Sequence, residues 1–464
     1  MTEDNDHTVK AGRGLAGRMR AVAGARSNPV VRDTVLTTGF NIVGKGIGFG
    51  IPVFLAAWFG VGAETDAFFF AYGLVLLMAG IFSPVVESVI VPFIVEARAR
   101  NEAEVKSLIG SALVLAALGL AALGTLLFLV SKPLLALVTN FPQESLDLIS
   151  RLLLETIPLL VLLVATSLLA GALNAYKLFY LPAVSPAIRA VVAIAFIFAL
   201  RGRLGVHSIA IGYCAGELVR FVALFARAAK SGIAPSISSI GFDAKVYQFL
   251  TTASYQITGM AILVFSPVVN KTMASWTGAG GVSILEYADR LYEIPVTLIA
   301  RGLFVVLLSH WSVGFYGGLE QHLKRDVMRT AKIVGAGALV LSVALILMRA
   351  PLVGLIYGRG AFRPEHLPAV GGVWAIYLIG LGPMMFGRVF AQAHLVLKNT
   401  RLLMLAGIMN FALNIVLNLA LIGPLGINGL ALSTTLTHAA VAVVLALCFL
   451  GRAGRPKSAG EGRG

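Results

Sequence analysis

The chain has 464 residues, of which 58% are hydrophobic and only 13% charged, and its mean hydropathy is +0.88. A soluble domain carries about 25% charged residues, so this composition excludes a water-soluble globular protein. The formal net charge of +15 would be compatible with nucleic-acid binding. However, the basic residues gather in alternate segments between apolar stretches, which is typical of a membrane protein with both termini in the cytoplasm. Their expected partners are anionic membrane lipids rather than nucleic acid.

Apolar stretches of about 20 residues, long enough to cross a bilayer as helices, recur from end to end. After a basic cytoplasmic tail over residues 1–34, the sequence predicts twelve transmembrane helices, at 35–59, 67–94, 108–131, 152–174, 181–200, 206–228, 246–272, 283–308, 330–348, 369–396, 402–421 and 428–450. A cytoplasmic linker over 229–245 separates an N-terminal lobe at 35–228 from a C-terminal lobe at 246–450, and a second tail covers 451–464. The expected fold class is an all-α polytopic membrane protein.

The two predicted lobes resemble each other. Leu204-Gly205-Val206 recurs as Leu425-Gly426-Ile427, and Lys177 matches Lys398 at the same spacing. Because one repeat holds six helices, both lobes would have the same orientation and be related by an axis along the membrane normal. Such a fold places a cavity between the lobes and changes its access by rocking one lobe against the other.

Four charged residues lie on one face of the predicted eighth helix. Glu286, Asp289, Arg290 and Glu293 are spaced i, i+3, i+4 and i+7, and Arg301 extends the same stripe. A charge within the bilayer costs about 2.5–3.5 kcal/mol on insertion scales, so this face must be paired or face water. The stripe is therefore the first candidate for a functional site.

Other polar residues also interrupt the predicted helices. Lys45 lies among glycines in the first helix, where it would face the cavity or pair with Glu87 of the second helix. Asn410, Asn414 and Asn418 recur every four residues along the eleventh helix. They could bind a substrate or ion, or form hydrogen bonds between helices.

Two further charges, Glu217 and Arg220, have the i, i+3 spacing of a pair within the N-terminal lobe. The histidines show no metal-ligand spacing, and Cys214 and Cys448 lie in apolar spans. No nucleophile elbow, zinc-protease motif or dinucleotide fingerprint is present. We therefore expect a transporter that uses no metal or cofactor rather than an enzyme.

Two stretches resemble the MurJ/MviN family of lipid-linked oligosaccharide flippases, which belongs to the MOP superfamily with Wzx-type and MATE transporters. They are Thr65-Asp66-Ala67-Phe68-Phe69, where the first helix joins the second, and Ala288-Asp289-Arg290-Leu291, in the eighth helix. The stretch from Asn414 to Asn418 is a weaker match. The resemblance extends over nearly the whole chain in order. It implies transport of an undecaprenyl-pyrophosphate-linked sugar, such as lipid II, from the cytoplasmic to the outer leaflet.

In this family, the resemblance implies, arginines in the cavity meet the pyrophosphate. Arg290 matches one of them, and Lys45 stands where another is expected. Two more family arginines are absent, because helix 1 has Ile51 and helix 2 has Met78 and Ala79 at these places. The resemblance also implies two further C-terminal helices, which help to hold the lipid tail and which this sequence lacks.

The sequence thus predicts a flippase of the bacterial cytoplasmic membrane whose Arg290 and Lys45 receive the head group. Asp289 and Glu293 would hold Arg290 in position. One alternative is a MATE-like cation or drug antiporter, in which Glu87, Glu286, Asp289 and Glu293 matter and Arg290 does not. The other is a non-transporting scaffold for cell-envelope synthesis. The expected partners are a lipid-linked glycan and membrane lipids, with envelope-synthesis enzymes as candidates, and the oligomeric state stays open.

Overall fold

The computed structural model describes the chain except for residues 1–43, 45, 235–240, 242–243, 317–319 and 453–464. The described part is helical and contains no strand. The first lobe consists of a helix at Gly46–Phe59 and of α3 (Ala63–Arg100), α4 (Glu102–Val138), α5 (Gln143–Ala175), α6 (Tyr180–Leu204) and α7 (His207–Lys230). The long apolar stretches of the sequence form these helices because a helix satisfies every backbone polar group within the membrane.

The second lobe repeats this arrangement. It contains α9 (Ser266–Ala274), α10 (Gly281–Tyr316), α11 (Glu320–Leu347), α12 (Arg349–Tyr357), α13 (Leu367–Val396), α14 (Thr400–Leu425) and α15 (Ile427–Arg452). Before it, α8 (Ala244–Val264) lies along α3 and α4 of the first lobe. The predicted seventh helix is thus two helices. Phe265 separates them, and Pro267 occupies the first turn of α9, where proline is favourable.

Every predicted transmembrane helix has a counterpart, and the expected all-α polytopic fold with two lobes is confirmed. Among the described helices, nine are long and apolar enough to cross a membrane. The remaining counterparts are the Gly46–Phe59 helix, α8 with α9, and α10. The short helix α12 was not expected, because its apolar residues follow directly on those of α11.

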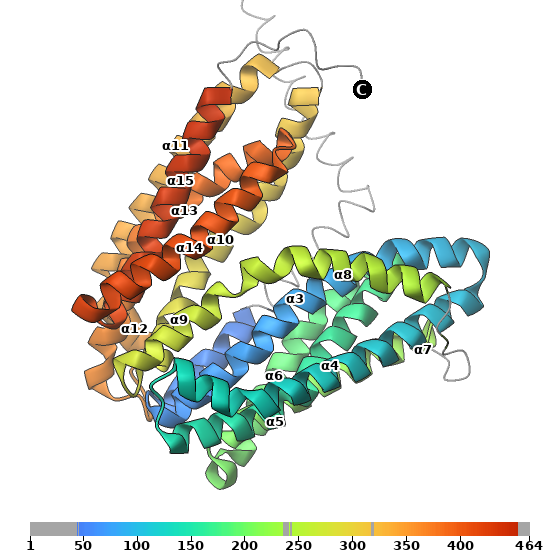
Figure 1. Cartoon of the computed structure of the whole chain (residues 1–464), viewed down its shortest axis with the longest axis horizontal. Helices are drawn as coiled ribbons and strands as arrows, with labels where there is room; N and C mark the ends of the chain where they lie inside the picture. The colour runs from blue at the N-terminus through green and yellow to red at the C-terminus, as the bar shows by residue number, and fades with distance from the viewer. Residues whose placement is uncertain (1–43, 45, 235–240, 242–243, 317–319, 453–464) are drawn as a thin grey trace, which may run out of the picture.

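The lobes meet at one end and diverge toward the other, as Figure 1 shows. The end at which they meet, called here the closed end, contains the start of α3, the turn before α10 and the end of α12. At the diverging end lie the end of α3 and the start of α11 and α14.

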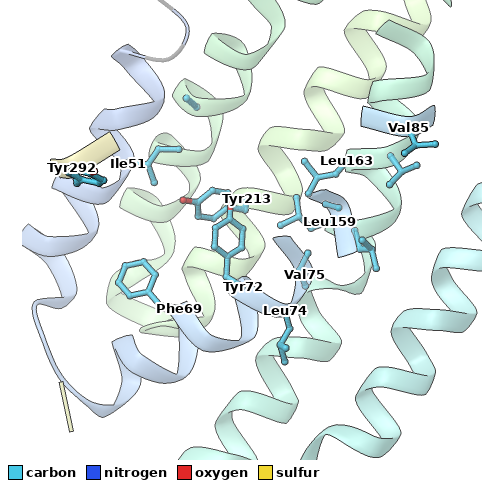
Figure 2. Close-up of a cluster of buried hydrophobic side chains, with 14 of the residues drawn as sticks. Ile51, Phe69, Tyr72, Leu74, Val75, Val85, Leu159, Leu163, Tyr213 and Tyr292 are labelled. Carbon is cyan, nitrogen blue, oxygen red and sulfur yellow. The ribbon is translucent and has the colours of Figure 1, made fainter. Parts of the chain in front are cut away.

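The first lobe has a well-packed core between α3, α5 and α7. Figure 2 shows Tyr72, Leu74 and Val75 of α3 beside Leu159 and Leu163 of α5. By contrast, the most exposed large apolar side chains, among them Leu137 and Leu347, point outward from their helices. This pattern fits a bilayer, in which apolar side chains can cover the outside of the protein.

Candidate functional site

A carboxylate of the first lobe caps a helix of the second lobe at the closed end. Asp66 Oδ2 accepts a hydrogen bond from the backbone N–H of Gly280 (2.6 Å), and Oδ1 accepts from the N–H (2.7 Å) and hydroxyl (2.6 Å) of Ser283. The first N–H groups of α10 have no partner inside the helix and carry a partial positive charge. Buried Asp66 therefore fastens the start of α10 to α3.

Three further contacts fasten the same end. The hydroxyl of Tyr287 donates to the carbonyl of Gly60 (3.0 Å), and the N–H of Ala361 donates to the carbonyl of Ala57 (2.8 Å). Tyr357 in turn donates to the carbonyl of Tyr287 (3.1 Å). Gly60 has a φ of +66°, and a Cβ there would lie 2.4 Å from the carbonyl oxygen of Ala361. Backbone approaches backbone here, so position 60 has no room for a side chain.

The charged stripe on α10 forms an ion-pair network. Glu286, whose side chain is only 4% exposed, accepts Arg290 Nη2 at 2.6 Å and Lys271 Nζ at 2.7 Å. Arg290 Nη1 also contacts Glu293 at 3.0 Å. The side chain of Arg290 is 25% exposed and that of Glu293 is 56% exposed. The network therefore runs from a buried carboxylate to an accessible arginine.

Lys271 was not among the residues singled out from the sequence. It reaches from α9 into the first lobe, where its ammonium also donates to the carbonyl of Phe69 (3.1 Å). Gly73 gives it space, because a Cβ at Gly73 would lie 2.9 Å from Lys271 Nζ. A lysine inside an apolar helix was the available signal, but nothing near it in sequence indicated Glu286 as its partner.

Asp289 lies next to Arg290 in α10 but differs from the two glutamates of the stripe. Arg290 pairs with Glu286 and Glu293, and no ion pair links it to Asp289 in the described part of the chain. Adjacent residues point to different sides of a helix, whereas residues three or four apart share a face. Asp289 lies within Coulombic range of Arg290, and also of Tyr292 and Tyr377. Glu286 and Glu293 pair with Arg290 directly, and the expectation that Asp289 helps to hold Arg290 stays a prediction.

A second buried charge cluster lies within the first lobe. Glu217 contacts Arg220 at 2.9 Å, which confirms the predicted i, i+3 pair, and Arg189 of α6 at 3.4 Å. Glu87 is half-buried and accepts a long hydrogen bond (3.5 Å) from Asn174. Arg220 lies within Coulombic range of Glu87. Glu87 thus belongs to the first-lobe cluster.

The asparagines of α14 connect helices of the second lobe. Asn414, which is buried, donates to Thr434 (3.3 Å), and Asn418 donates to Asn270 of α9 (2.8 Å). For these two residues the structure shows the interhelical bonding that the sequence left as an alternative. Asn410 lines a cavity of about 240 Å³ between α13, α14 and α15.

Two of the predicted site residues cannot be placed. Lys45 lies outside the described residues, and Arg301 belongs to α10 but its side chain is outside them as well. Their expected contact with a head group stays a prediction.

Two helical lobes fastened at one end, with accessible charges between them in the membrane-spanning part, define a transporter of the alternating-access class. The chain belongs to the family described as lipid II flippase MurJ, whose family model matches residues 55–460. A similar relative is the probable lipid II flippase MurJ of Rhizobium meliloti (strain 1021), 26% identical over 420 residues, which cover 87% of this chain and 77% of the relative.

Solved structures show the same fold. The lipid II flippase MurJ in its inward closed conformation superposes with a TM-score of 0.77 at 23% identity, over 90% of this chain and 87% of that one. A multidrug resistance MATE family transporter of the MOP superfamily, in its inward-facing conformation, gives 0.73 at 12% identity, over 90% of this chain and 98% of that one. Both similarities concern the fold alone.

Proposed function

We propose that the chain flips a lipid-linked glycan, lipid II or a related undecaprenyl-pyrophosphate-linked sugar, from the cytoplasmic to the outer leaflet. Membership in the MurJ family supports the class of cargo. The charges between the lobes support recognition of an anionic head group. The partners are then the lipid-linked substrate and the surrounding membrane lipids.

One observation carries the proposal: Arg290 is accessible while its main carboxylate partner is shared. Glu286 is shared by two cations, Lys271 at 2.7 Å and Arg290 at 2.6 Å, so this carboxylate does not neutralise Arg290 alone. The second partner, Glu293, is largely exposed. Exposed ion pairs contribute about 0–1 kcal/mol, so a pyrophosphate can replace Glu293 at the guanidinium. Arg290 can then bind two phosphate oxygens at once.

The orientation follows from the basic residues. Arg98 and Arg100 end α3, and Lys398 and Arg401 flank the start of α14, all at the diverging end of the lobes. The positive-inside rule assigns this end to the cytoplasm, with both termini on that side. The closed end, fastened by Asp66, then faces outward, and the head group enters from the cytoplasm. Opening of the closed end would release it on the other side.

Replacement of Arg290 tests the proposal. Arg290→Gln should fold, because Lys271 still neutralises Glu286, but it should fail to rescue a bacterial strain depleted of its lipid II flippase. Arg290→Lys should rescue partly, since lysine keeps the charge but loses the two-pronged geometry. Glu293→Gln is the matched control on the same helix face and should rescue. Full rescue by Arg290→Gln at normal expression would refute the proposed role.

A cation-coupled antiporter is a second candidate, favoured by Asp289. This residue of α10 is largely buried but not fully, and no ion pair satisfies its carboxylate in the described part of the chain. A carboxylate in that position can bind a proton or a metal cation. If the chain is an antiporter, Asp289→Asn should abolish drug resistance in an overexpressing strain while Arg290→Gln should not. If it is a flippase, neither variant changes drug resistance.

A further inference from the structure

In the charge cluster of the first lobe, Glu217 pairs with two arginines and binds them unequally. Glu217 is fully buried, and its Oε1 already accepts Arg220 at 2.9 Å and the hydroxyl of Thr166 at 2.5 Å. Arg189 reaches only Oε2, at 3.4 Å. Two arginines thus share the carboxylate of Glu217, and Arg189 forms the longer and weaker ion pair with it.

Arg189 also has unused hydrogen-bonding capacity. Its Nε is buried and finds no partner among the described residues, although a guanidinium presents five N–H donors. The side chain is nevertheless 25% exposed. A charged donor in the middle of a membrane helix that is neither fully paired nor fully buried must meet water or a ligand.

Two tyrosine hydroxyls lie beside this arginine. Tyr72 of α3 and Tyr213 of α7 have ring centroids 4.7 Å apart, and neither hydroxyl has a hydrogen-bond partner in the described part of the chain. Both are within Coulombic range of Arg189 and, from the opposite lobe, of Arg290. Figure 2 shows the Tyr213 hydroxyl directed away from Leu159 and Leu163, toward the side where Ile51 lies. The two tyrosines therefore lie close enough to interact with an arginine of each lobe, Arg189 and Arg290.

Helix packing fixes this arrangement. A Cβ at Gly216 of α7 would lie 2.5 Å from the carbonyl oxygen of Arg189, so α6 and α7 are in close backbone contact at this level. Gly216 is one turn from Tyr213 on α7. The close approach holds Arg189 and Tyr213 in a defined relation across the two helices.

We infer that Arg189, Tyr72 and Tyr213 form a phosphate-binding site on the first lobe, which holds the pyrophosphate of the lipid-linked substrate opposite Arg290. The inference rests on the proposed function. The site offers a cation and hydroxyl donors, and the carboxylate that pairs with Arg189, Glu217, is fully buried. Glu286 lies within Coulombic range of both tyrosines, but Lys271 and Arg290 already pair with it. This composition suits an oxyanion, because a guanidinium carries a positive charge and only donates hydrogen bonds.

Direct binding tests this site. The full chain in lipid nanodiscs is titrated with undecaprenyl pyrophosphate, and with undecaprenol and inorganic pyrophosphate for comparison. Arg189→Gln should weaken binding of undecaprenyl pyrophosphate at least tenfold, because charged hydrogen bonds each contribute roughly that much. The double variant Tyr72→Phe/Tyr213→Phe should weaken it about fivefold to tenfold. Binding of undecaprenol should not change.

Two matched controls separate the site from general effects. Arg201→Gln removes an arginine from the same helix, where it stacks on Trp58, and Tyr247→Phe removes an exposed hydroxyl from α8. Both should bind undecaprenyl pyrophosphate within twofold of the unchanged protein. If Arg189→Gln does not fold, the tyrosine double variant decides, since phenylalanine keeps the shape of the ring.

The outcomes distinguish the inference from the proposed function. If Arg290→Gln weakens binding but Arg189→Gln and the tyrosine double variant stay within twofold, the first-lobe site is refuted and the flippase proposal stands. If the unchanged protein does not bind undecaprenyl pyrophosphate, both are refuted. If inorganic pyrophosphate binds as tightly as the lipid, the site recognises free phosphate and its assignment to the substrate is wrong.

Discussion

The carboxylate of Asp66 accepts hydrogen bonds from both the N–H (2.7 Å) and the hydroxyl (2.6 Å) of Ser283, across the boundary between the two lobes. A helix usually receives its N-terminal cap from the residue that precedes it. Here α10 receives it from α3 of the other lobe, so the cap exists only while the closed end is closed. The pair therefore contributes to the balance between the two access states.

We predict that Asp66→Asn favours opening of the closed end. Asparagine can accept with its oxygen, but its NH₂ group would face the N–H donors of α10. Loss of a charged hydrogen bond costs about 1.5–3 kcal/mol, which would raise the open population by roughly tenfold to a hundredfold. Spin labels at Leu137→Cys in α4 and Leu355→Cys in α12, with Cys214 and Cys448 replaced by alanine, would report a longer distance.

The matched control for this experiment is Asn101→Ala. Asn101 caps α4 by accepting from the N–H of Ala103 at 2.9 Å, entirely within the first lobe. Its loss should lower stability by about 1 kcal/mol without changing the label distance. An unchanged distance in Asp66→Asn would show that the cap does not influence the access state.

Gly73→Ala should disturb the contact between Lys271 and the first lobe. The new Cβ would lie 2.9 Å from Nζ and 3.0 Å from Cδ of Lys271, so the lysine must withdraw from the carbonyl of Phe69. We expect reduced flipping in proteoliposomes. Gly119→Ala in α4, where a Cβ meets nothing within 4 Å, should flip normally and gain slightly in melting temperature, since alanine favours helix. Equal activity of the two variants would contradict the proposed importance of this contact.

The buried carboxylate Glu286 should tolerate the loss of either cation but not of both. Lys271→Met and Arg290→Met should each fold, because one partner remains at 2.6–2.7 Å. The double variant leaves an unpaired buried charge, which costs about 3–5 kcal/mol and should abolish the folded protein in detergent. Adding Glu286→Gln to the double variant should restore folding, as measured by gel filtration. Failure of that rescue would mean that the lysine and arginine stabilise the fold in another way.

The asparagines of α14 should differ in their effect on stability. Asn418 is fully buried and bonded to Asn270, Asn414 and Ser433, so Asn418→Ala should lower the free energy of unfolding by about 1–2 kcal/mol. Asn410 lines a cavity, and Asn410→Ala should change it by less than about 0.5 kcal/mol. Thermal unfolding in detergent measures both. A larger loss of stability in Asn410→Ala than in Asn418→Ala would contradict the assignment of the stabilising hydrogen bonds to Asn418.

The parts of the site that depend on local spacing could be predicted from the sequence. Glu286, Arg290 and Glu293 are i, i+4 and i+7 on one helix, and the structure pairs them. Glu217 and Arg220 are i, i+3, and they also pair. Helix periodicity alone brings these side chains together, as it also fixes the lengths of the transmembrane helices.

The contacts between lobes could not be predicted in this way. Lys271 meets Glu286 only because the chain breaks at Phe265 and turns at Gly278 and Gly280, and Asp66 meets Ser283 only once the lobes have docked. Apolar helices of similar pattern do not encode which faces meet. The sharing of Glu217 between Arg189 and Arg220 likewise depends on how α6 and α7 pack.

The central claim is that Arg290 binds the head group of a lipid-linked glycan. The most direct test measures flipping of fluorescent lipid II in proteoliposomes that contain the unchanged protein, Arg290→Gln, Arg290→Lys or Glu293→Gln. We predict rapid flipping by the unchanged protein and by Glu293→Gln, at least tenfold slower flipping by Arg290→Lys, and only background flipping by Arg290→Gln. Flipping by Arg290→Gln at the rate of the unchanged protein would contradict the claim.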